Sequence, residues 1–423
     1  MAAGLASALG LAAFSAFGSA AFLAGFSVGG NSGRLNTGCI LPFNRCAVVR
    51  RRFGFRSFRS MPIVIKRPEP GAANRIPHGL RWKSRGNEQY GFGVPSNTQH
   101  MSEPKVIEEG VEVMRAAKRL VSEVGKAILG KEDTVRKAAL ALLCNGHLLI
   151  EDVPGVGKTV LAKALARAIG GEFRRIQFTP DLLPSDITGV AMFNQQRSEF
   201  EFRPGPIFGN IVLADEINRA TPKTQAALLE AMEERQVTVD GTTHHLPDPF
   251  FVIATQNNVE MTGTYPLPEA QLDRFFARLS MGYPDRETEA DILDSQRVNH
   301  PLDDVEQVLH TSDFHKLQHE IKQVEVSPAI RRYIVDIVRA TRDSNQVVLG
   351  ASPRGSLLLM QAAQAEAAYA ARGYVTPDDV KVMAPAVLSH RVIPRADLRS
   401  RGLEPENVIQ EIIATVPVPV PGG

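Results

Sequence analysis

Residues 151–159 read Glu-Asp-Val-Pro-Gly-Val-Gly-Lys-Thr, and this stretch decides the fold. It follows an apolar run, residues 147–150, that is short enough to be a buried parallel strand. A helical pattern begins at Lys158 and continues to Ile169, where two glycines end it. A glycine-rich turn between a strand and a helix lets backbone N–H groups converge on phosphate oxygens, and the helix dipole adds to that attraction. The stretch therefore predicts a phosphate-binding loop.

The same loop carries the side chains that a nucleoside triphosphate and its magnesium ion require. Lys158 is expected to reach the β- and γ-phosphates, and the Thr159 hydroxyl is expected to bind Mg²⁺. In the usual pattern G-x-x-x-x-G-K-T the first residue is glycine, whereas here it is Asp152, an acid that suits phosphates only if it points away from them. The alternative is an ordinary turn followed by a helix. The expected nucleotide-binding residues of the loop are Asp152, Val153, Pro154, Gly155, Val156, Gly157, Lys158, Thr159 and Val160.

A second chemical element is the segment 210–216, an apolar strand that ends in Asp215 and Glu216. In an open parallel sheet, ligands bind at the carboxyl ends of the strands. Asp215 is therefore expected beside Thr159, where it would hold Mg²⁺ directly or through water. Glu216 is expected to polarise the attacking water. The alternative is that the acids are only solvated charges at the end of a strand. One acid in such a place is common, whereas a pair at this position is less so.

The order of the strand and helix patterns predicts an α/β fold. Strand-like runs at 173–178, 210–214 and 250–254 are separated by helical segments, of which 223–234 is the clearest. Such alternation indicates a parallel sheet with helices on both faces. Two further helices, 104–127 and 133–143, are expected before the first strand.

After Pro284 the pattern becomes helical and no strand is expected. The predicted helices of this region are 285–297, 303–319, 328–342, 355–372 and 377–388. We therefore expect a second, small all-helical domain behind the α/β core. The predicted divisions of the chain are a leader at 1–100, an α/β core with N-terminal helices at 101–283, a helical domain at 284–415 and a Pro-rich tail at 416–423.

The leader differs from the rest of the chain in charge. Residues 1–100 hold 13 Lys and Arg against two acids, whereas residues 101–423 hold 35 against 44. Residues 1–33 are uncharged and the basic residues follow them, which is not the order of a signal peptide. A membrane anchor, a transit peptide and a start site at Met101 are the alternatives. We expect a cytoplasmic protein, with membrane association or organelle targeting only if residues 1–100 are translated.

Composition excludes several classes of protein. The 423 residues are 43% apolar and 22% charged, which is typical of two or three globular domains. The three cysteines, Cys39, Cys46 and Cys144, are too few for a disulfide framework or a four-cysteine zinc site. The acidic balance of residues 101–423 argues against nucleic acid as the main partner, because phosphate backbones bind basic faces.

Beyond these elements, several motifs together resemble the MoxR family of AAA+ ATPases. The resemblance extends from about residue 104 to the C-terminal end, and residues 1–100 match nothing in that family. It implies an AAA+ P-loop core followed by a helical lid. The stretches that carry it are EDVPGVGKT (151–159), FTPDLLPSDITG (178–189), FRPGPIF (202–208), ADEINRATPKTQAALLEAMEE (214–234), VIATQN (252–257), YPLPEAQLDRF (265–275), GASPRG (350–355), RGYVTPDDV (372–380) and VLSHR (387–391).

The resemblance implies catalytic roles for three further residues. Asn257 matches the sensor-1 position, where a polar side chain helps to orient the attacking water. Arg274 matches the arginine finger, which acts on the nucleotide of a neighbouring subunit, and Arg278 is a second candidate for that role. Arg354 matches sensor 2 at the start of a lid helix. On position alone, each arginine would instead be a surface salt-bridge residue.

The resemblance also implies ligands and partners. Ile128 and Gly130 belong to a segment that resembles the adenine-side loop, so ATP and Mg²⁺ are the expected cofactors. A finger that acts between subunits implies a ring, commonly of six, and the family suggests a client or adaptor protein with a von Willebrand factor A domain. Two predicted hairpins, 190–203 and 236–246, would face the pore or a partner. The alternatives are a nucleotide-binding scaffold with little turnover and a related chelatase or DNA-directed ring motor.

Overall fold

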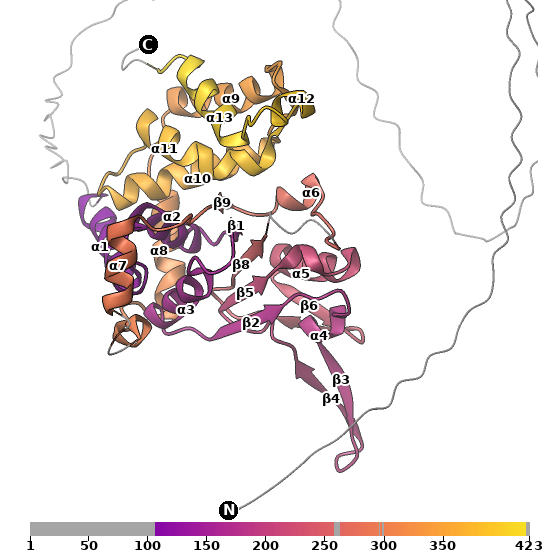
Figure 1. The fold of residues 1–423 in the computed structure, drawn as a ribbon. Coiled ribbons are helices and arrows are strands. Elements are labelled where there is room, and N and C mark those ends of the chain that lie inside the picture. The colour runs from indigo at the N-terminus through magenta and orange to yellow at the C-terminus, as the bar shows by residue number, and fades with distance from the viewer. Residues whose placement is uncertain (1–105, 258–262, 296, 298–299, 420–423) are drawn as a thin grey trace, which may run out of the picture. The chain divides into compact units, whose positions relative to one another are not determined.

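Figure 1 shows the computed structural model of the chain, which describes residues 106–257, 263–295, 297 and 300–419. The leader expected at residues 1–100, with its membrane and targeting alternatives, lies outside the described residues, as does the end of the Pro-rich tail. Among the helices that the structure describes, none combines the length and the apolar character that a bilayer crossing needs.

A five-stranded parallel sheet forms the centre of the α/β core, in the order β2-β5-β8-β1-β9. Four strands lie where the sequence predicts them, three at apolar runs and one, β2, at a mixed run. The fifth, β9, was not expected, because three residues are too few to give a pattern and its pairing with β1 is what defines it. The strands are β1 (Leu148–Glu151), β2 (Phe173–Gln177), β5 (Ile211–Asp215), β8 (Phe251–Gln256) and β9 (Ala277–Leu279).

Both faces of the sheet are covered, because successive residues of a strand point to opposite sides. Ile150 of β1 packs into a core that it shares with α1, α2 and α3. Its neighbour Leu149 packs into a second core that contains apolar side chains of α5. The helices of the α/β core are α1 (Val106–Ala127), α2 (Glu132–Leu143), α3 (Lys158–Ala168), α4 (Pro184–Thr188), α5 (Pro222–Glu234) and α6 (Glu269–Leu272).

Two antiparallel hairpins lie where the sequence predicts them. β3 (Gly189–Asn194) pairs with β4 (Glu199–Pro204), and β6 (Gln236–Val239) pairs with β7 (Thr242–His245). The predicted turn Asp240–Gly241 has φ values of 49° and 78°. Positive φ at both central residues is what a two-residue hairpin turn with the native strand twist requires.

The β3–β4 hairpin extends away from the sheet (Figure 1) and follows α4 directly. After the hairpin, residues 205–210 lead to β5 without forming a helix. Gly189 lies at the base of the hairpin with φ of 95°, and a Cβ there would lie 2.3 Å from the Arg203 carbonyl oxygen. The sharp change from helix to hairpin therefore depends on glycine at this position.

The region after Pro284 is mainly helical, and its last helices form a lid that packs on the core. α10 contacts α1 and α2, and α11 contacts β9. Helices α9 and α11 begin at the predicted residues, Pro328 and Pro377. The helices of this region are α7 (Arg286–Ser295), α8 (Phe314–Gln323), α9 (Pro328–Asp343), α10 (Pro353–Tyr369), α11 (Pro377–Leu388), α12 (Ala396–Arg399) and α13 (Pro405–Thr415).

Three features of this region differ from expectation. The predicted helix 303–319 begins only at Phe314, because the preceding chain forms short 3₁₀ turns. A small antiparallel pair, β10 (Val347–Leu349) and β11 (Ile393–Pro394), joins segments that are too short to show a strand pattern. Helix α13 was also missed, although its apolar residues are buried at helical spacing.

Candidate active site

The stretch 151–159 forms the predicted loop between β1 and α3. Gly155 and Gly157 have φ values of 86° and 95°, in the left-handed region that favours glycine. Helix α3 begins at Lys158, directly after Gly157. The unpaired N–H groups of its first turn therefore face the space that the loop encloses, as an anion site requires.

A pocket of about 410 Å³ lies at this loop and joins the predicted polar residues. Lys158 and Thr159 come from the loop and α3, Asp215 and Glu216 follow β5, and Asn257 follows β8. All five line the same space because the strands that carry them are parallel neighbours. The full lining is Pro154, Gly155, Gly157, Lys158, Thr159, Val160, Arg175, Gln177, Asp215, Glu216, Thr255 and Asn257.

A second pocket, of about 200 Å³, shares Gly155, Gly157 and Val160 with the first and is more apolar. Ile128 and Leu129, which follow α1, line it together with Met281, which follows β9, and Ile292 of α7. Gly130 does not line it, because this residue packs against the Thr288 side chain of α7. A polar pocket that continues into an apolar one suits a nucleotide, whose phosphates and base differ in the same way.

Asp152 points away from the phosphate pocket. Its Oδ2 accepts hydrogen bonds from the backbone N–H groups of Met281 (2.6 Å) and Gly282 (2.7 Å) and from the Ser280 hydroxyl (3.1 Å). Its Oδ1 accepts a hydrogen bond from the N–H of Val153 at 2.9 Å. The carboxylate therefore ties the loop to the wall of the apolar pocket.

Lys158 lies folded against its own loop. Its Nζ donates hydrogen bonds to the carbonyl oxygens of Asp152 (2.9 Å) and Val153 (3.1 Å). Burial lowers the pKa of Lys158, while the carboxylates of Asp152, Asp215 and Glu216 act in the opposite direction. These carboxylates favour the charged ammonium that phosphate binding needs.

The carboxylate of Asp215 is held from two sides. Its Oδ1 accepts a hydrogen bond from the Thr255 hydroxyl at 2.6 Å, and its Oδ2 pairs with the Arg175 guanidinium at 2.5 Å. Thr159 lines the same pocket, so a hydroxyl and a carboxylate are available there, and such oxygen donors suit Mg²⁺. Among the described residues there is no cluster of three or more acids, histidines or cysteines that suits a metal.

Glu216 has an unusual backbone conformation, with φ of 55°, which few residues other than glycine adopt. Its N–H donates a hydrogen bond to the Thr255 hydroxyl at 2.8 Å. Its carboxylate accepts one from the Gln177 amide at 2.9 Å and pairs with Arg219 at 3.1 Å. These contacts fix the direction of the carboxylate at the edge of the pocket.

Sequence reasoning missed three residues of the pocket, Arg175, Gln177 and Thr255. The first two alternate on β2, so they share one face, and Gln177 is the register partner of Asp215. Arg175 and Gln177 could have been found from the polar residues at alternate positions of β2, since the strands β1, β5 and β8 of the same sheet are mostly apolar. Thr255 lies within an otherwise apolar strand and gave no signal of its own.

The three candidate arginines do not line the phosphate pocket. Arg274 Nε and Arg354 Nη1 pair with the two oxygens of one carboxylate, Glu233, at 2.8 Å and 3.0 Å. Arg278 is more buried and pairs with Glu151 at 2.9 Å and with Glu406. Since β9 is parallel to β1, the turn that carries Arg274 lies at the amino edge of the sheet, opposite the phosphate loop.

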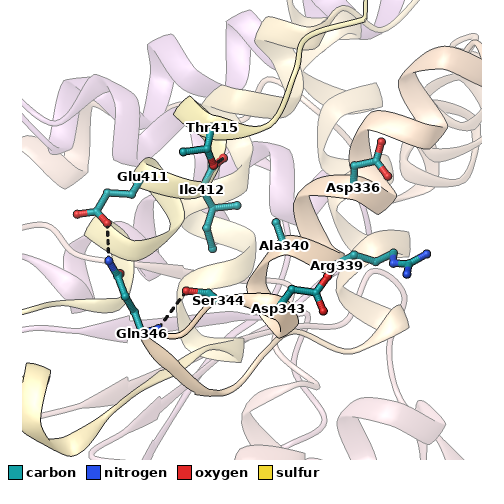
Figure 2. A pocket seen from close by; sticks show the side chains of 9 residues that line it. All are labelled: Asp336, Arg339, Ala340, Asp343, Ser344, Gln346, Glu411, Ile412 and Thr415. Carbon is teal, nitrogen blue, oxygen red and sulfur yellow. Dashed lines mark hydrogen bonds between the residues drawn. The ribbon is translucent and has the colours of Figure 1, made fainter.

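A further pocket, of about 590 Å³, lies on the lid between α9, β10 and α13. Figure 2 shows its side chains, with the Gln346 amide donating a hydrogen bond to Glu411 at 2.9 Å. Three carboxylates and one arginine line it, so its charge opposes phosphate binding. The lining residues are Asp336, Arg339, Ala340, Asp343, Ser344, Gln346, Glu411, Ile412 and Thr415.

The fold and the site together define a P-loop ATPase of the AAA+ class with a helical lid. Residues 147–277 match the ATPase family associated with various cellular activities, and residues 339–412 match the AAA lid domain. The chain is 41% identical to the protein named Chaperone MoxR1 of Mycobacterium tuberculosis, over 79% of this chain and 90% of that one. The chain belongs to the MoxR family of AAA+ ATPases.

Two other similarities each extend over more than two thirds of the chain. A Bacillus subtilis protein named YeaC is 54% identical, over 71% of this chain and 94% of its own. A solved structure from Cytophaga hutchinsonii matches with a TM-score of 0.69 at 37% identity, over 74% of this chain and 98% of that one. The family resemblance found in the sequence motifs is thus confirmed.

Proposed function

We propose that this protein hydrolyses ATP with Mg²⁺ as a ring of subunits and uses the turnover to remodel or mature client proteins. The observation that carries the proposal is the single pocket that joins Lys158, Thr159, Asp215, Glu216 and Asn257. A phosphate loop alone would support nucleotide binding. The added acid pair and the polar residue after β8 support hydrolysis.

Each residue of the pocket has a separate part in the proposed reaction. Backbone N–H groups of the loop and Lys158 bind the phosphates, and Thr159 and Asp215 hold Mg²⁺. The bound ion would neutralise charge on the β- and γ-phosphates. Glu216 polarises the attacking water, whose position Asn257 helps to fix.

Arg274 and Arg354 support a reaction shared between subunits. Both pair with Glu233, and the turn of Arg274 lies at the edge of the sheet opposite the loop, so Arg274 reaches phosphate only in another copy of the chain. We propose that Arg274 is the arginine finger and that Arg354 acts beside it as sensor 2. Arg278 is the weaker candidate because Glu151 and Glu406 already hold it within its own chain. The resulting assembly is a closed ring, which we propose has six subunits.

The β3–β4 hairpin supports a protein partner. Val190, Met192, Phe193 and Phe200 are exposed on it, and Phe200 is 73% exposed. Exposed apolar groups along a projecting element are typical of contacts with other proteins. We propose that the hairpin faces a client or an adaptor with a von Willebrand factor A domain. The name of the Mycobacterium tuberculosis relative, a chaperone, supports this choice over nucleic acid.

The test is ATP hydrolysis by the full chain, measured with Mg²⁺ at increasing protein concentration. We expect specific activity to rise with concentration, because a finger from a second subunit completes each site. Glu216→Gln and Arg274→Ala should each lower kcat by about 10³-fold or more when measured alone. Mixed in equal amounts, they should regain activity, because the Glu216→Gln subunit supplies its intact finger to the intact pocket of the other.

A matched control is Arg395→Gln, which removes an exposed arginine that pairs with Asp397 on the lid surface. It should leave both kcat and its concentration dependence unchanged. If the wild type binds ATP but hydrolyses it no faster than Glu216→Gln does, the catalytic assignments fail and the scaffold interpretation replaces them. The feature of the sequence that favours a scaffold is Asp152 at the first position of the loop, and its carboxylate is bound to the N–H groups of Met281 and Gly282, away from the phosphate pocket.

A further inference from the structure

The turn Asp273–Phe276, which carries the proposed finger, is held by one buried arginine of the lid. Arg391 lies in the motif VLSHR, to which the proposed reaction gives no role, and its side chain is 1% exposed. Its Nε donates a hydrogen bond to Asp273 Oδ1 at 2.7 Å. Its Nη2 donates to the carbonyl oxygens of Asp273, at 3.0 Å, and of Phe275. His390 adds a contact from Nε2 to the Phe275 carbonyl oxygen at 3.1 Å.

Nε and Nη2 of Arg391 together donate to three acceptors of one turn, a carboxylate oxygen and two backbone carbonyl oxygens. A guanidinium presents its donors in a rigid planar fork, so it fixes the positions of several acceptors at once. Burial lowers the pKa of Arg391 to about 10, with Asp273 opposing the change, so the group stays charged near neutral pH. A buried charge with these partners allows few other arrangements of the turn.

The lid is tied to the same turn at two more points, each beside a proposed catalytic arginine. Asp273 Oδ2 accepts a hydrogen bond from the Ser352 hydroxyl at 2.9 Å, two residues before Arg354. Glu233 bridges Arg274 on the turn and Arg354 on α10. The two arginines are therefore held side by side by contacts that cross from the core to the lid.

We propose that Arg391 is a positioning residue that fixes the finger turn to the lid, so that Arg274 and Arg354 reach a neighbouring nucleotide as one unit. The proposal rests on the proposed function, since it requires the finger to act between subunits. Arg391 itself does not line the nucleotide pocket. Its effect is therefore expected on the neighbouring subunit's kcat and not on nucleotide binding by its own subunit.

The test is Arg391→Gln in the full chain, with kcat and the Kd for ATP measured separately. A finger that is misplaced by about 1 Å should lower kcat by about 10²-fold while the Kd for ATP changes less than about threefold. Arg391→Lys keeps the charge but loses the fork, and it should recover only part of kcat. The exposed variant Arg395→Gln serves again as the control with unchanged kcat.

Mixing with Glu216→Gln subunits distinguishes a positioning role from general damage. The Arg391→Gln subunit keeps an intact pocket, so a finger from its Glu216→Gln neighbour should restore activity. An unchanged kcat for Arg391→Gln, or a mixture that stays inactive, overturns the proposal. If the mixture of Arg274→Ala with Glu216→Gln also stays inactive, it is the proposed function that has failed.

A second variant keeps the test open if Arg391→Gln does not fold. Asp273→Asn removes only the charge of a side chain that is 24% exposed, so the fold should tolerate it. It weakens the ion pair between the finger turn and Arg391 by changing the partner that belongs to the core. The same loss of kcat, restored by mixing with Glu216→Gln, is expected, and an unchanged kcat in a folded Asp273→Asn ring overturns the proposal.

Discussion

Thr255 lies at the carboxyl end of β8, 1% exposed, and its hydroxyl contacts both members of the acid pair. It donates a hydrogen bond to Asp215 Oδ1 and accepts one from the backbone N–H of Glu216. One side chain thus orients the proposed metal ligand and stabilises the unusual backbone of the proposed catalytic acid. The proposed metal ligand and the proposed catalytic acid, both at the carboxyl end of β5, therefore depend on a residue of the neighbouring strand β8.

We expect Thr255→Val to separate binding from hydrolysis. The substitution keeps the shape but leaves the N–H of Glu216 without its acceptor, which costs about 1–3 kcal/mol of stability. The Kd for ATP should change little, because the phosphate loop is untouched, while kcat should fall at least tenfold. Thr255→Ser, which keeps the hydroxyl, is the control and should retain most of kcat. Equal loss of kcat in both variants would contradict the role of the hydroxyl.

The residues that sequence analysis identified in the pocket belong to motifs with short spacing. Lys158, Thr159, Asp215 and Glu216 are each defined by the strand or helix that adjoins them. Arg175 could not be found in this way, because its position in the pocket depends on which strands are neighbours in the sheet. Strand order follows from tertiary packing, and a single strand does not encode it.

The start of α11 is the element whose local chemistry the sequence predicted best. Thr376, Pro377 and the two acids that follow have the order typical of a helix start, and in the structure Asp379 accepts hydrogen bonds from the N–H of Thr376 at 2.7 Å and its hydroxyl at 2.8 Å. Arg372 adds an ion pair to the same carboxylate. Capping was predictable because all its partners lie within eight residues. By contrast, β9 and β10 were missed because their partners are distant in sequence.

We expect Asp379→Ala to destabilise the lid by about 2–3 kcal/mol, because it removes a helix cap and an ion pair together. The matched control is Asp378→Asn, the adjacent acid in the same turn, whose side chain is 85% exposed. It should change the free energy of unfolding by no more than about 0.5 kcal/mol. Urea unfolding followed by circular dichroism measures both values. Similar losses in the two variants would contradict the capping role.

At the scale of the whole molecule, two histidines of the described part of the chain, His147 and His390, are buried in neutral form. His147 accepts a hydrogen bond from the N–H of Val252 at Nδ1 (3.0 Å) and contacts the Met232 carbonyl oxygen through Nε2 at 3.1 Å. Burial lowers the pKa of His147 to about 3 and places the pKa of His390, beside Arg391, well below its usual value. Both side chains connect separate parts of the fold, and their burial disfavours the protonated, charged form.

These histidines should make the fold sensitive to mild acid. The unfolded chain takes up a proton on each as the pH falls through about 6.5, whereas the folded chain does not, so the free energy of unfolding decreases below that pH. Between pH 7.5 and 5.5 each should contribute a loss of about 1.4 kcal/mol. His147→Asn keeps an acceptor near Nδ1 and should remove its share of this loss, whatever its effect at pH 7.5. A pH dependence equal to that of the wild type would contradict the assignment.

The parallel pairing of β1 with β9 gives each subunit two unlike edges, one with the phosphate loop and one with the finger turn. In the proposed ring, every interface then joins the loop edge of one copy to the turn edge of the next. A conformational change in one subunit would then affect ATP hydrolysis in only one of its two neighbours. Coupling between subunits would therefore pass around the ring in a single direction. A subunit without Arg274 would abolish ATP hydrolysis in the neighbour that receives its finger. Its own pocket, completed by the finger of the other neighbour, would continue to hydrolyse ATP.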